Sequence, residues 1–468
     1  MKKKEKNANT IVVTRKIQIE PIGESKTNDF VHQYVDEAMI AQYRAKNLLT
    51  GQIGAMYYKY GKQMAYNDIK RAVAYSHNPI LADIDFPTGL DLKATILFTI
   101  GNEFFTAVKN GIWNGERTIS NYKKKAPFYT KSRHIKLICD FREEDMENYK
   151  EDPTNPQYEQ TLLQNMKVTL KWVNKKSFKV VLGCTLDIRE MLFKIYTGEY
   201  GICDSKIQVL DNKNDRNKMK KIMLLLSVRM PIENYDLDEN TVVGVDIGAK
   251  NPAVCALNND KTARLYCGDN FAMLRVHEAH LAERKDNQVR AVFNKSQHGR
   301  RKKLRKLYIN DTTERSKTKN INHEISKQVV AFALEHHAKY INLEELTGYF
   351  DLPENADKRK LWSYYEIQMM IKYKASMYGI EVRMVDSKYT SQICSFCGSN
   401  QEGQLIDRDT FICKNPECDS HGIEGAYIES DFNAARNIAK STNWAKTKKK
   451  KAKEKDKEES EKEVGETN

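Results

Sequence analysis

The segment Val242-Val243-Gly244-Val245-Asp246-Ile247-Gly248 is a short apolar run that contains one carboxylate and ends in glycine. Its β-branched residues predict a buried strand that carries Asp246 to its open end. Burying a carboxylate is costly unless the group is paired or bound to a metal. A single acid at a strand end is common, however, so Asp246 alone does not establish a site.

Two later segments supply further acids in similar surroundings. Residues 340–346 form a second apolar run, interrupted by Glu344 and Glu345, and residues 429–439 place Asp431 at the start of a helical pattern. Three carboxylates from two strands and a helix can hold two divalent cations about 4 Å apart, the arrangement that serves phosphodiester hydrolysis. Oxygen ligands favour Mg²⁺ or Mn²⁺ over zinc.

The sequences around these acids resemble a known family. Gly-Val-Asp-Ile-Gly, Asn-Leu-Glu-Glu-Leu and Ser-Asp-Phe-Asn-Ala-Ala-Arg-Asn-Ile are similar to the three split motifs of RuvC-type nucleases, as found in transposon-encoded TnpB proteins and miniature type V (type V-F-like) CRISPR effectors. The resemblance covers under half of the chain. It implies that Asp246, Glu344 and Asp431 are the catalytic, metal-binding acids, while the neighbouring Glu345 and Glu429 remain alternative ligands.

Four cysteines predict a second metal site. Two residues lie between Cys394 and Cys397, four lie between Cys413 and Cys418, and 15 residues separate the two pairs. Two such thiolate pairs can close a tetrahedral four-sulfur site, which indicates structural Zn²⁺. The second spacing is looser than usual, so His421 remains an alternative ligand.

The charge of the chain indicates a nucleic-acid partner. The formal net charge is +14, from 77 Lys and Arg against 63 Asp and Glu, and seven of the 12 residues 295–306 are basic with no acid among them. Charge runs are often only solvated, but an unbalanced run repels itself, which favours phosphate binding. The residues expected to bind nucleic acid are Lys295, Arg300, Arg301, Lys302, Lys303, Arg305 and Lys306.

The composition excludes several classes of protein. Hydrophobic residues make up 40% of the chain, without an apolar run of about 18 residues that would span a membrane, and no apolar signal core follows the charged N-terminus. Five of the nine cysteines are scattered singly, as in proteins from a reducing compartment. We therefore expect an intracellular protein, and the resemblance implies the cytoplasm of a prokaryotic cell.

The first half alternates between strand and helix patterns. Residues 11–22 predict a strand, and residues 28–111 a helical segment whose tyrosines alternate with cations and either stack nucleobases or pack the helices. Short strands then recur over residues 119–229, which indicates an antiparallel barrel or sandwich. They are expected at 135–139, 167–172, 178–182 and 221–228.

The second half predicts a mixed sheet. Strands at 252–257 and 263–267 follow the Asp246 strand, and the chain continues with a helical stretch over 271–308, a separate helix over 320–339 and a last strand over 380–386. These elements match the order expected for an RNase H-like sheet.

The resemblance implies a multidomain α+β protein: an N-terminal wedge-like β-barrel with an inserted helical recognition domain, then an RNase H-like (RuvC) α/β nuclease domain interrupted by a zinc ribbon. The expected divisions are the first wedge strands (1–27), helical recognition domain (28–114), remainder of the wedge barrel (115–230), linker (231–240), first nuclease segment (241–387), zinc-ribbon nucleic-acid-binding insertion (388–423), second nuclease segment (424–445) and disordered charged tail (446–468).

By resemblance, the expected function is RNA-guided, Mg²⁺-dependent cleavage of DNA in antiviral defence. The implied partners are a guide RNA, target double-stranded DNA and a second copy of the chain, forming a homodimer on one RNA. Three alternatives remain: a transposon-encoded TnpB-type nuclease, a guided repressor that binds DNA without cutting, and an unguided RNase H-like resolvase. The intact set of acids opposes the repressor.

Overall fold

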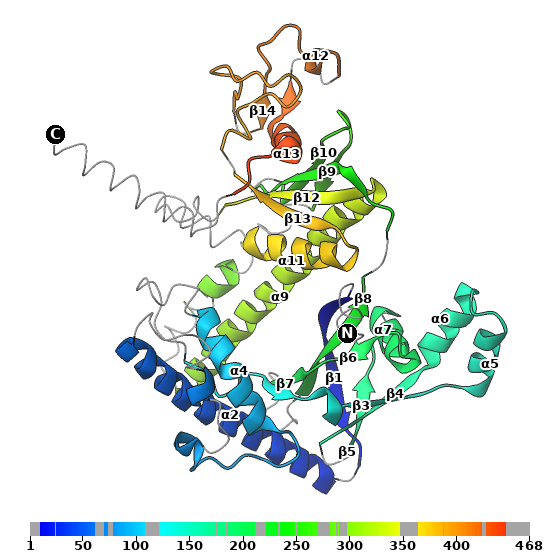
Figure 1. Ribbon diagram of the computed structural model, residues 1–468, viewed down its shortest axis with the longest axis vertical. Coiled ribbons are helices and arrows are strands. Elements are labelled where there is room, and N and C mark those ends of the chain that lie inside the picture. Colours follow the sequence, from blue (N-terminus) through cyan, green and yellow to red (C-terminus); the bar gives the residue numbers. More distant parts are fainter. Residues whose placement is uncertain are drawn as a thin grey trace. The chain divides into compact units, whose positions relative to one another are not determined.

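The computed structural model describes residues 10–23, 25–60, 70–73, 78–107, 121–173, 176–183, 186–210, 221–232, 235–248, 251–268, 281–286, 289, 297–346, 364–386, 388–407, 409–423 and 427–445. The chain divides into two compact units, Met1–Pro231 and Ile232–Asn468, which are drawn in Figure 1. No helix of the described residues is long and apolar enough to cross a membrane. The charged tail expected at 446–468 lies outside the described residues.

The first unit is built on an eight-stranded sheet. Its strands run in the order β2-β7-β8-β1-β5-β4-β3, and the short β6 pairs with β8. The strands are β1 (Thr10–Pro21), β2 (Phe128–Thr130), β3 (Lys136–Asp140), β4 (Lys167–Trp172), β5 (Lys176–Val181), β6 (Gly201–Ile202), β7 (Ser205–Leu210) and β8 (Lys221–Pro231). All pairs are antiparallel. Among the described residues the pairing does not join β2 to β3, so closure into a barrel stays a prediction.

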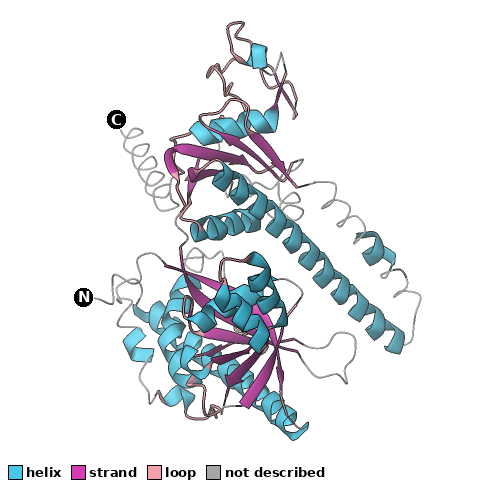
Figure 2. Cartoon of the chain, turned by 90° about the vertical axis from the view of Figure 1, so that its right-hand side faces the viewer, coloured by secondary structure: helices cyan, strands magenta, loops and turns pink. Residues whose placement is uncertain are grey.

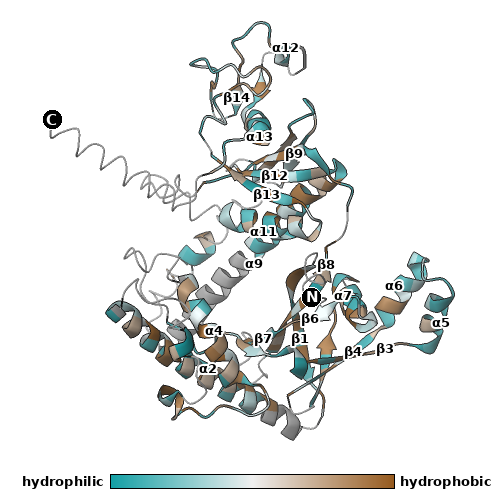
Figure 3. Ribbon diagram, viewed as in Figure 1, coloured by the Kyte–Doolittle hydropathy of each residue, from teal (hydrophilic) through white to brown (hydrophobic). Residues whose placement is uncertain are grey.

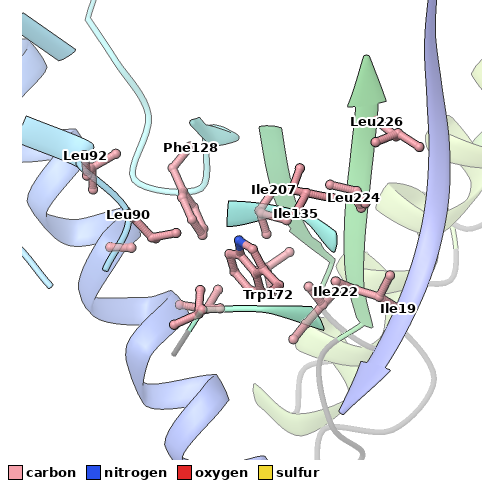
Figure 4. Close-up of a cluster of buried hydrophobic side chains, with 14 of the residues drawn as sticks. Ile19, Leu90, Leu92, Phe128, Ile135, Trp172, Ile207, Ile222, Leu224 and Leu226 are labelled. Carbon is pink, nitrogen blue, oxygen red and sulfur yellow. The ribbon is translucent and has the colours of Figure 1, made fainter. Parts of the chain in front are cut away.

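The sheet shares one core with the helices that follow β1. The long helix α2 (Ser25–Tyr60), the 3₁₀ turn η2 (Pro79–Leu81) and α4 (Leu92–Ala107) come before β2, and the helices carry both hydrophobic and hydrophilic residues (Figure 3). Phe128 and Trp172 stack with ring centroids 6.3 Å apart. Figure 4 shows these two rings among aliphatic side chains of the same cluster, such as Leu90 and Ile222. The predicted helical segment is therefore packed against the sheet.

Three helices interrupt the region in which the sequence predicts only strands. They are α5 (Glu143–Glu151), α6 (Pro156–Asn165) and α7 (Leu186–Thr197). Helices of nine to twelve residues are marginal in isolation and depend on tertiary packing. Here Leu162 and Leu192 are fully buried, which explains why a local pattern did not reveal them.

The second unit contains a five-stranded mixed sheet (Figure 2). The strand order is β11 (Arg264–Cys267), β10 (Ala253–Leu257), β9 (Asp238–Asp246), β12 (Ala338–Glu344) and β13 (Glu381–Val385). The first three are antiparallel, whereas β12 runs parallel to both β9 and β13. The predicted strands of this unit are present, and the ends of β9 and β12 that carry acids lie at the same edge.

Helices cover both faces of this sheet. The helices α9 (Gln297–Glu335) and α11 (Tyr364–Met377) pack on one face, and α13 (Ser430–Lys440) packs on the other, as Figure 1 shows. The prediction of a break between a helical stretch ending at 308 and a separate helix beginning at 320 was wrong, because α9 continues unbroken from Gln297 to Glu335. Beyond β13, Asn443 and Ala445 form backbone hydrogen bonds at its edge.

Candidate functional site

Side-chain alternation along β9 directs Asp246 toward α13. Val243 and Val245 pack into the core that β9 shares with α9 and α11, and successive side chains of a strand point to opposite faces. Gly244 and Asp246 therefore face α13. A Cβ at Gly244 would overlap the backbone of Ala435 and Ala439, so this glycine allows the helix to lie directly on the strand.

Strand β12 both carries the second acid and holds the far end of α13. The buried Asn342 donates from Nδ2 to the carbonyl oxygen of Ile438, 3.0 Å away, near the helix C-terminus. Glu344 lies two residues after Asn342 in β12, so its side chain is on the same face of the sheet. Its side chain is only 8% exposed, and its carboxylate Oε1 accepts a 2.6 Å hydrogen bond from the Thr390 hydroxyl.

The third acid, Asp431, lies in the first turn of α13. Asn251, in the loop after β9, donates from Nδ2 to Asp431 Oδ2 at 2.8 Å and to Glu429 Oε1 at 3.1 Å. Glu429 is the N-cap of α13, because its Oε2 accepts from the backbone N–H of Phe432 at 3.2 Å, and it also accepts from the Tyr266 hydroxyl at 2.9 Å. These contacts give Glu429 a structural role beside Asp431.

Neighbouring acids raise the pKa of Asp246. Loss of hydration in this partly buried position, followed by the negative charges of Glu344, Asp431 and Glu429, raises the pKa of Asp246 well above its usual value. Burial raises the pKa of Glu344 to about 7, against the lowering effect of the Thr390 hydrogen bond, and Asp386 adds further repulsion. Glu344 and Asp431 therefore both lie close enough to Asp246 to repel its charge.

These residues fit a divalent cation. The donors are carboxylate oxygens, which Mg²⁺ and Mn²⁺ prefer, and a cation would relieve the repulsion that raises the pKa values of Asp246 and Glu344. A pair of cations about 4 Å apart needs carboxylates spread over a larger space than the ligands of one ion. Which of the acids bind metal stays a prediction, including the alternatives Glu345 and Glu429.

The four cysteines come together as a compact group. Their sulfurs all lie within 4.8 Å of one another, with Sγ–Sγ distances of 3.7 Å for Cys394 and Cys418 and 3.6 Å for Cys397 and Cys413. Four sulfurs around zinc at about 2.3 Å would be separated by about 3.8 Å. The group therefore fits a tetrahedral zinc site.

His421 is outside that group. It lies in α12 (Ser420–Ile423), and its Nε2 is 3.1 Å from the carbonyl oxygen of Asn415. Among the described residues, the cysteines are the one set of His, Cys, Asp and Glu side chains gathered this tightly. The cysteines, rather than the histidine, are the ligands that the geometry favours.

The cysteine ribbon rests on the helix that carries Asp431. Asn433 of α13 accepts from the backbone N–H of Ser395 at 2.8 Å, and Lys440 donates to the Ser395 carbonyl at 2.6 Å. Arg436, almost completely buried, stacks 4.2 Å from the centroid of the Phe396 ring. The short strands β14 (Thr410–Phe411) and β15 (Ile428–Glu429) pair antiparallel, and β15 leads directly into α13.

The basic residues expected to bind nucleic acid remain a prediction. Lys295 lies outside the described residues, and the side chains of the other six, near the start of α9, are also outside them. Their backbone is helical. The six are Arg300, Arg301, Lys302, Lys303, Arg305 and Lys306.

Sequence reasoning missed three polar residues that position the acids. Asn251, Asn342 and Thr390 each make their key contact with a residue 46 to 180 positions away. Asn342 lies within the second motif, and Thr390 lies in the Thr-Ser-Gln segment before the cysteines. Their positions were visible in the sequence, but their partners were not.

Sequence comparisons relate the chain to known nucleases. Residues 364–438 match the family model described as Cas12f1-like, TNB domain. The chain is 28% identical over 277 residues to the CRISPR-associated endodeoxyribonuclease Cas12f1 of Sulfoacidibacillus thermotolerans, covering 57% of this chain and 59% of that protein. It is 28% identical to the TnpB-like protein MJ0751 of Methanocaldococcus jannaschii, covering 34% and 56%.

The match to S. thermotolerans Cas12f1 spans less than two thirds of that protein. Among solved structures, the chain resembles the cryo-EM structure of a Cas12f1–sgRNA–target DNA complex with a TM-score of 0.61 and 17% identity, covering 92% of this chain and 99% of that one. At this identity the likeness is one of fold.

Proposed function

From its relationship to the Cas12f1-like miniature type V CRISPR nucleases and to TnpB, we propose that this chain is an RNA-guided DNA endonuclease. Its second unit would be a RuvC-like, RNase H-like nuclease domain interrupted by a zinc ribbon. The observation that carries the proposal is the placement of three acids at one edge of the sheet. Asp246 and Glu344 end adjacent parallel strands, and Asp431 lies in the first turn of α13, which packs directly on β9.

In this proposal Asp246, Glu344 and Asp431 hold Mg²⁺ or Mn²⁺. When bound, two such ions supply an activated water and stabilise the attacking and leaving oxygens of the scissile phosphodiester. The protein contributes the positions of its carboxylates. Asn251 holds Asp431 through its Nδ2, and α13 is held on β9 and β12 by the close approach at Gly244 and the Asn342 hydrogen bond.

The remaining regions of the chain have roles that the relationship to these nucleases implies. The four cysteines would bind structural Zn²⁺ and keep the ribbon folded beside α13. The basic N-terminal end of α9 would contact phosphates. The N-terminal unit would bind the guide RNA and a short motif in duplex DNA, while base pairing recognises the target. The Cas12f1 complex mentioned above contains an sgRNA and target DNA. Two copies on one RNA remain the expected assembly.

The RNA bound by the protein tests this proposal. The chain would be expressed with its native neighbouring locus, purified, and the RNA extracted and sequenced. A discrete RNA that combines a repeat-derived segment with variable spacers is expected. Absence of any discrete RNA would contradict guidance and favour an unguided nuclease.

A second candidate, the TnpB-type nuclease, is favoured by the match to the TnpB-like protein of M. jannaschii. A TnpB-type nuclease would cleave DNA by the same proposed chemistry but would use a different guide RNA. Bound RNA derived from a transposon end, instead of a repeat with spacers, would support this candidate.

A further inference from the structure

A buried hydroxyl contacts the carboxylate of Glu344. Thr390 is 7% exposed and its Oγ1 donates to Glu344 Oε1 at 2.6 Å. The main chain of Glu344 is fixed separately, because its carbonyl oxygen accepts from Gln368 Nε2 at 2.7 Å. The Thr390 hydroxyl therefore fixes the orientation of the carboxylate, whereas the Gln368 amide fixes the main chain.

Helix α13 holds Thr390 in place. The carbonyl oxygen of Thr390 accepts from Asn437 Nδ2 at 2.8 Å, and the same amide donates to the Ile393 carbonyl at 2.7 Å. Asn433 donates to Ile393 as well, at 2.8 Å. Thr390 thus connects Glu344 with the helix that carries Asp431.

The backbone before Thr390 is strained. Tyr389 has φ +66°, in the left-handed region that non-glycine residues seldom adopt. Its carbonyl oxygen accepts from the amides of Gln392 and Ile393, at 3.0 and 3.2 Å. Strain of this kind concentrates at functional sites.

We infer that Thr390 is a positioning residue that sets the carboxylate of Glu344 for divalent-cation binding. The inference rests on the proposed function of the acids. Threonine is β-branched and stiff at χ1, so its hydroxyl is a fixed reference for a side chain that otherwise turns about three bonds. The hydrogen bond to Oε1 fixes the orientation of the carboxylate, so its oxygens are held in place for a cation.

Manganese binding tests the inference without needing a guide RNA or catalysis. Free Mn²⁺ would be measured by electron paramagnetic resonance during titration of the zinc-loaded full chain, for wild type, Asp246→Asn, Thr390→Val and Thr390→Ser. Thr241→Val is the matched control. Thr241 is 5% exposed and its hydroxyl donates at 2.6 Å to Asp238, at the opposite end of β9 from Asp246.

Thr390→Val is expected to weaken Mn²⁺ binding about 10- to 100-fold, the usual effect of removing a hydrogen bond to a metal ligand. Thr390→Ser should restore the affinity, and Thr241→Val should leave it unchanged. Circular dichroism confirms that each variant is folded. In cleavage assays, Thr390→Val should need a higher Mg²⁺ concentration than wild type and should regain activity when Mg²⁺ is raised. A loss of folded protein would lower the activity at every Mg²⁺ concentration.

The two proposals fail separately. Equal Mn²⁺ affinities for folded Thr390→Val and wild type would overturn the role of Thr390 and leave the nuclease proposal intact. Absence of a saturable site that depends on Asp246 in the wild type would overturn the proposed function, and the inference with it. If valine and serine at position 390 weaken binding equally, the hydroxyl is not responsible and the inference is also wrong.

Discussion

At the scale of single residues, the site holds acidic side chains close together, and the repulsion between them opposes folding. Asp246 is partly buried beside the charges of three other acids, and burial raises the pKa of Glu344 to about 7. A cluster of this kind is unfavourable for stability alone, because each carboxylate loses hydration and repels its neighbours. Groups with shifted pKa values that lower the stability of the fold are common at functional sites.

Removing one charge should therefore stabilise the cation-free protein. Asp246→Asn keeps the shape of the side chain but removes a negative charge from the cluster, so we expect the zinc-loaded protein to have a higher unfolding temperature without added Mg²⁺ and a smaller rise on adding Mg²⁺. Differential scanning calorimetry measures both changes. Glu381→Gln, an exposed acid at the start of β13, is the control and should change neither. A lower unfolding temperature for Asp246→Asn would contradict the repulsion described above.

The sequence predicted the acids better than the residues that hold them. Asp246 was recognisable because its motif is followed in order by two further acidic motifs that together resemble those of RuvC-type nucleases. Asn251, by contrast, follows the strand in an ordinary polar turn, and its contact with Asp431 spans 180 positions. A hydrogen bond between distant segments has no local pattern, so only the fold could reveal it.

At the scale of elements, the contact between β9 and α13 depends on one missing side chain. Gly244→Ala would place a Cβ against the backbone of α13, forcing the helix from the sheet. We expect destabilisation of about 3 kcal/mol or more, comparable to the larger core defects, together with loss of Mn²⁺ binding. Urea unfolding measures the first effect and the spin-resonance titration the second.

Gly51→Ala is the matched control for this substitution. Gly51 lies within α2 and a Cβ there meets no atom within 4 Å. Alanine in a helix is favoured over glycine by up to about 1 kcal/mol, so this variant should be slightly more stable. Equal effects of the two substitutions would contradict the close approach of α13 to β9.

The first unit contains a buried ion pair that joins α2 to α4. Lys46 Nζ lies 2.8 Å from Glu103 Oε2, with side-chain exposures of 6% and 25%. Tyr122 and Tyr129 also donate to this carboxylate. Although burial raises the pKa of Glu103, Lys46 and the two phenols outweigh it and lower the pKa below its usual value.

Glu103→Gln should destabilise the unit by about 3 kcal/mol, because it leaves the Lys46 ammonium buried without its counter-charge. The Glu103 contribution is present above the unfolded pKa of about 4.5 and is lost as pH falls through the lower native pKa. The variant and wild type should therefore converge in acid, as urea unfolding between pH 7 and pH 3 would measure. Glu190→Gln, in an exposed pair with Lys194, should cost below about 1 kcal/mol.

The cysteine ribbon should require its metal. Cys397→Ser removes one of four thiolates, so zinc content should fall from one atom per chain and the contacts of Ser395 with α13 should loosen. Plasma emission spectroscopy measures the zinc, and limited proteolysis measures the ribbon. Cys203→Ser, outside the cluster, is the control. Full zinc content in Cys397→Ser would mean that another residue completes the site.

Elements with strong local patterns were predicted well. The strand expected at 11–22 is β1, because alternation and the closing proline are local signals. The short helices α5, α6 and α7 were missed, since packing rather than propensity defines them. The division of α9 into two helices was wrong because polar residues in a long helix do not by themselves break it.

At the scale of the whole molecule, charge indicated the class of partner. The excess of 77 basic over 63 acidic residues predicts nucleic-acid binding, and the S. thermotolerans relative named above is an endodeoxyribonuclease. Composition cannot identify a guide or a target, because in RNA-guided nucleases base pairing rather than protein contact carries the sequence information. The boundary between the two compact units falls after Pro231.

Cleavage of a matched target tests the central claim most directly. The complex purified with its RNA would be incubated with Mg²⁺ and plasmid DNA carrying a sequence complementary to that RNA within a randomised flanking library, using wild type and Asp246→Asn in parallel. We predict that the wild type cuts matched plasmid, and that the variant binds the same RNA but cuts at least about 100- to 1000-fold more slowly. Equal cutting by the variant, or binding of the target by wild type without any cutting, would contradict the assignment of Asp246, Glu344 and Asp431 as a nuclease site.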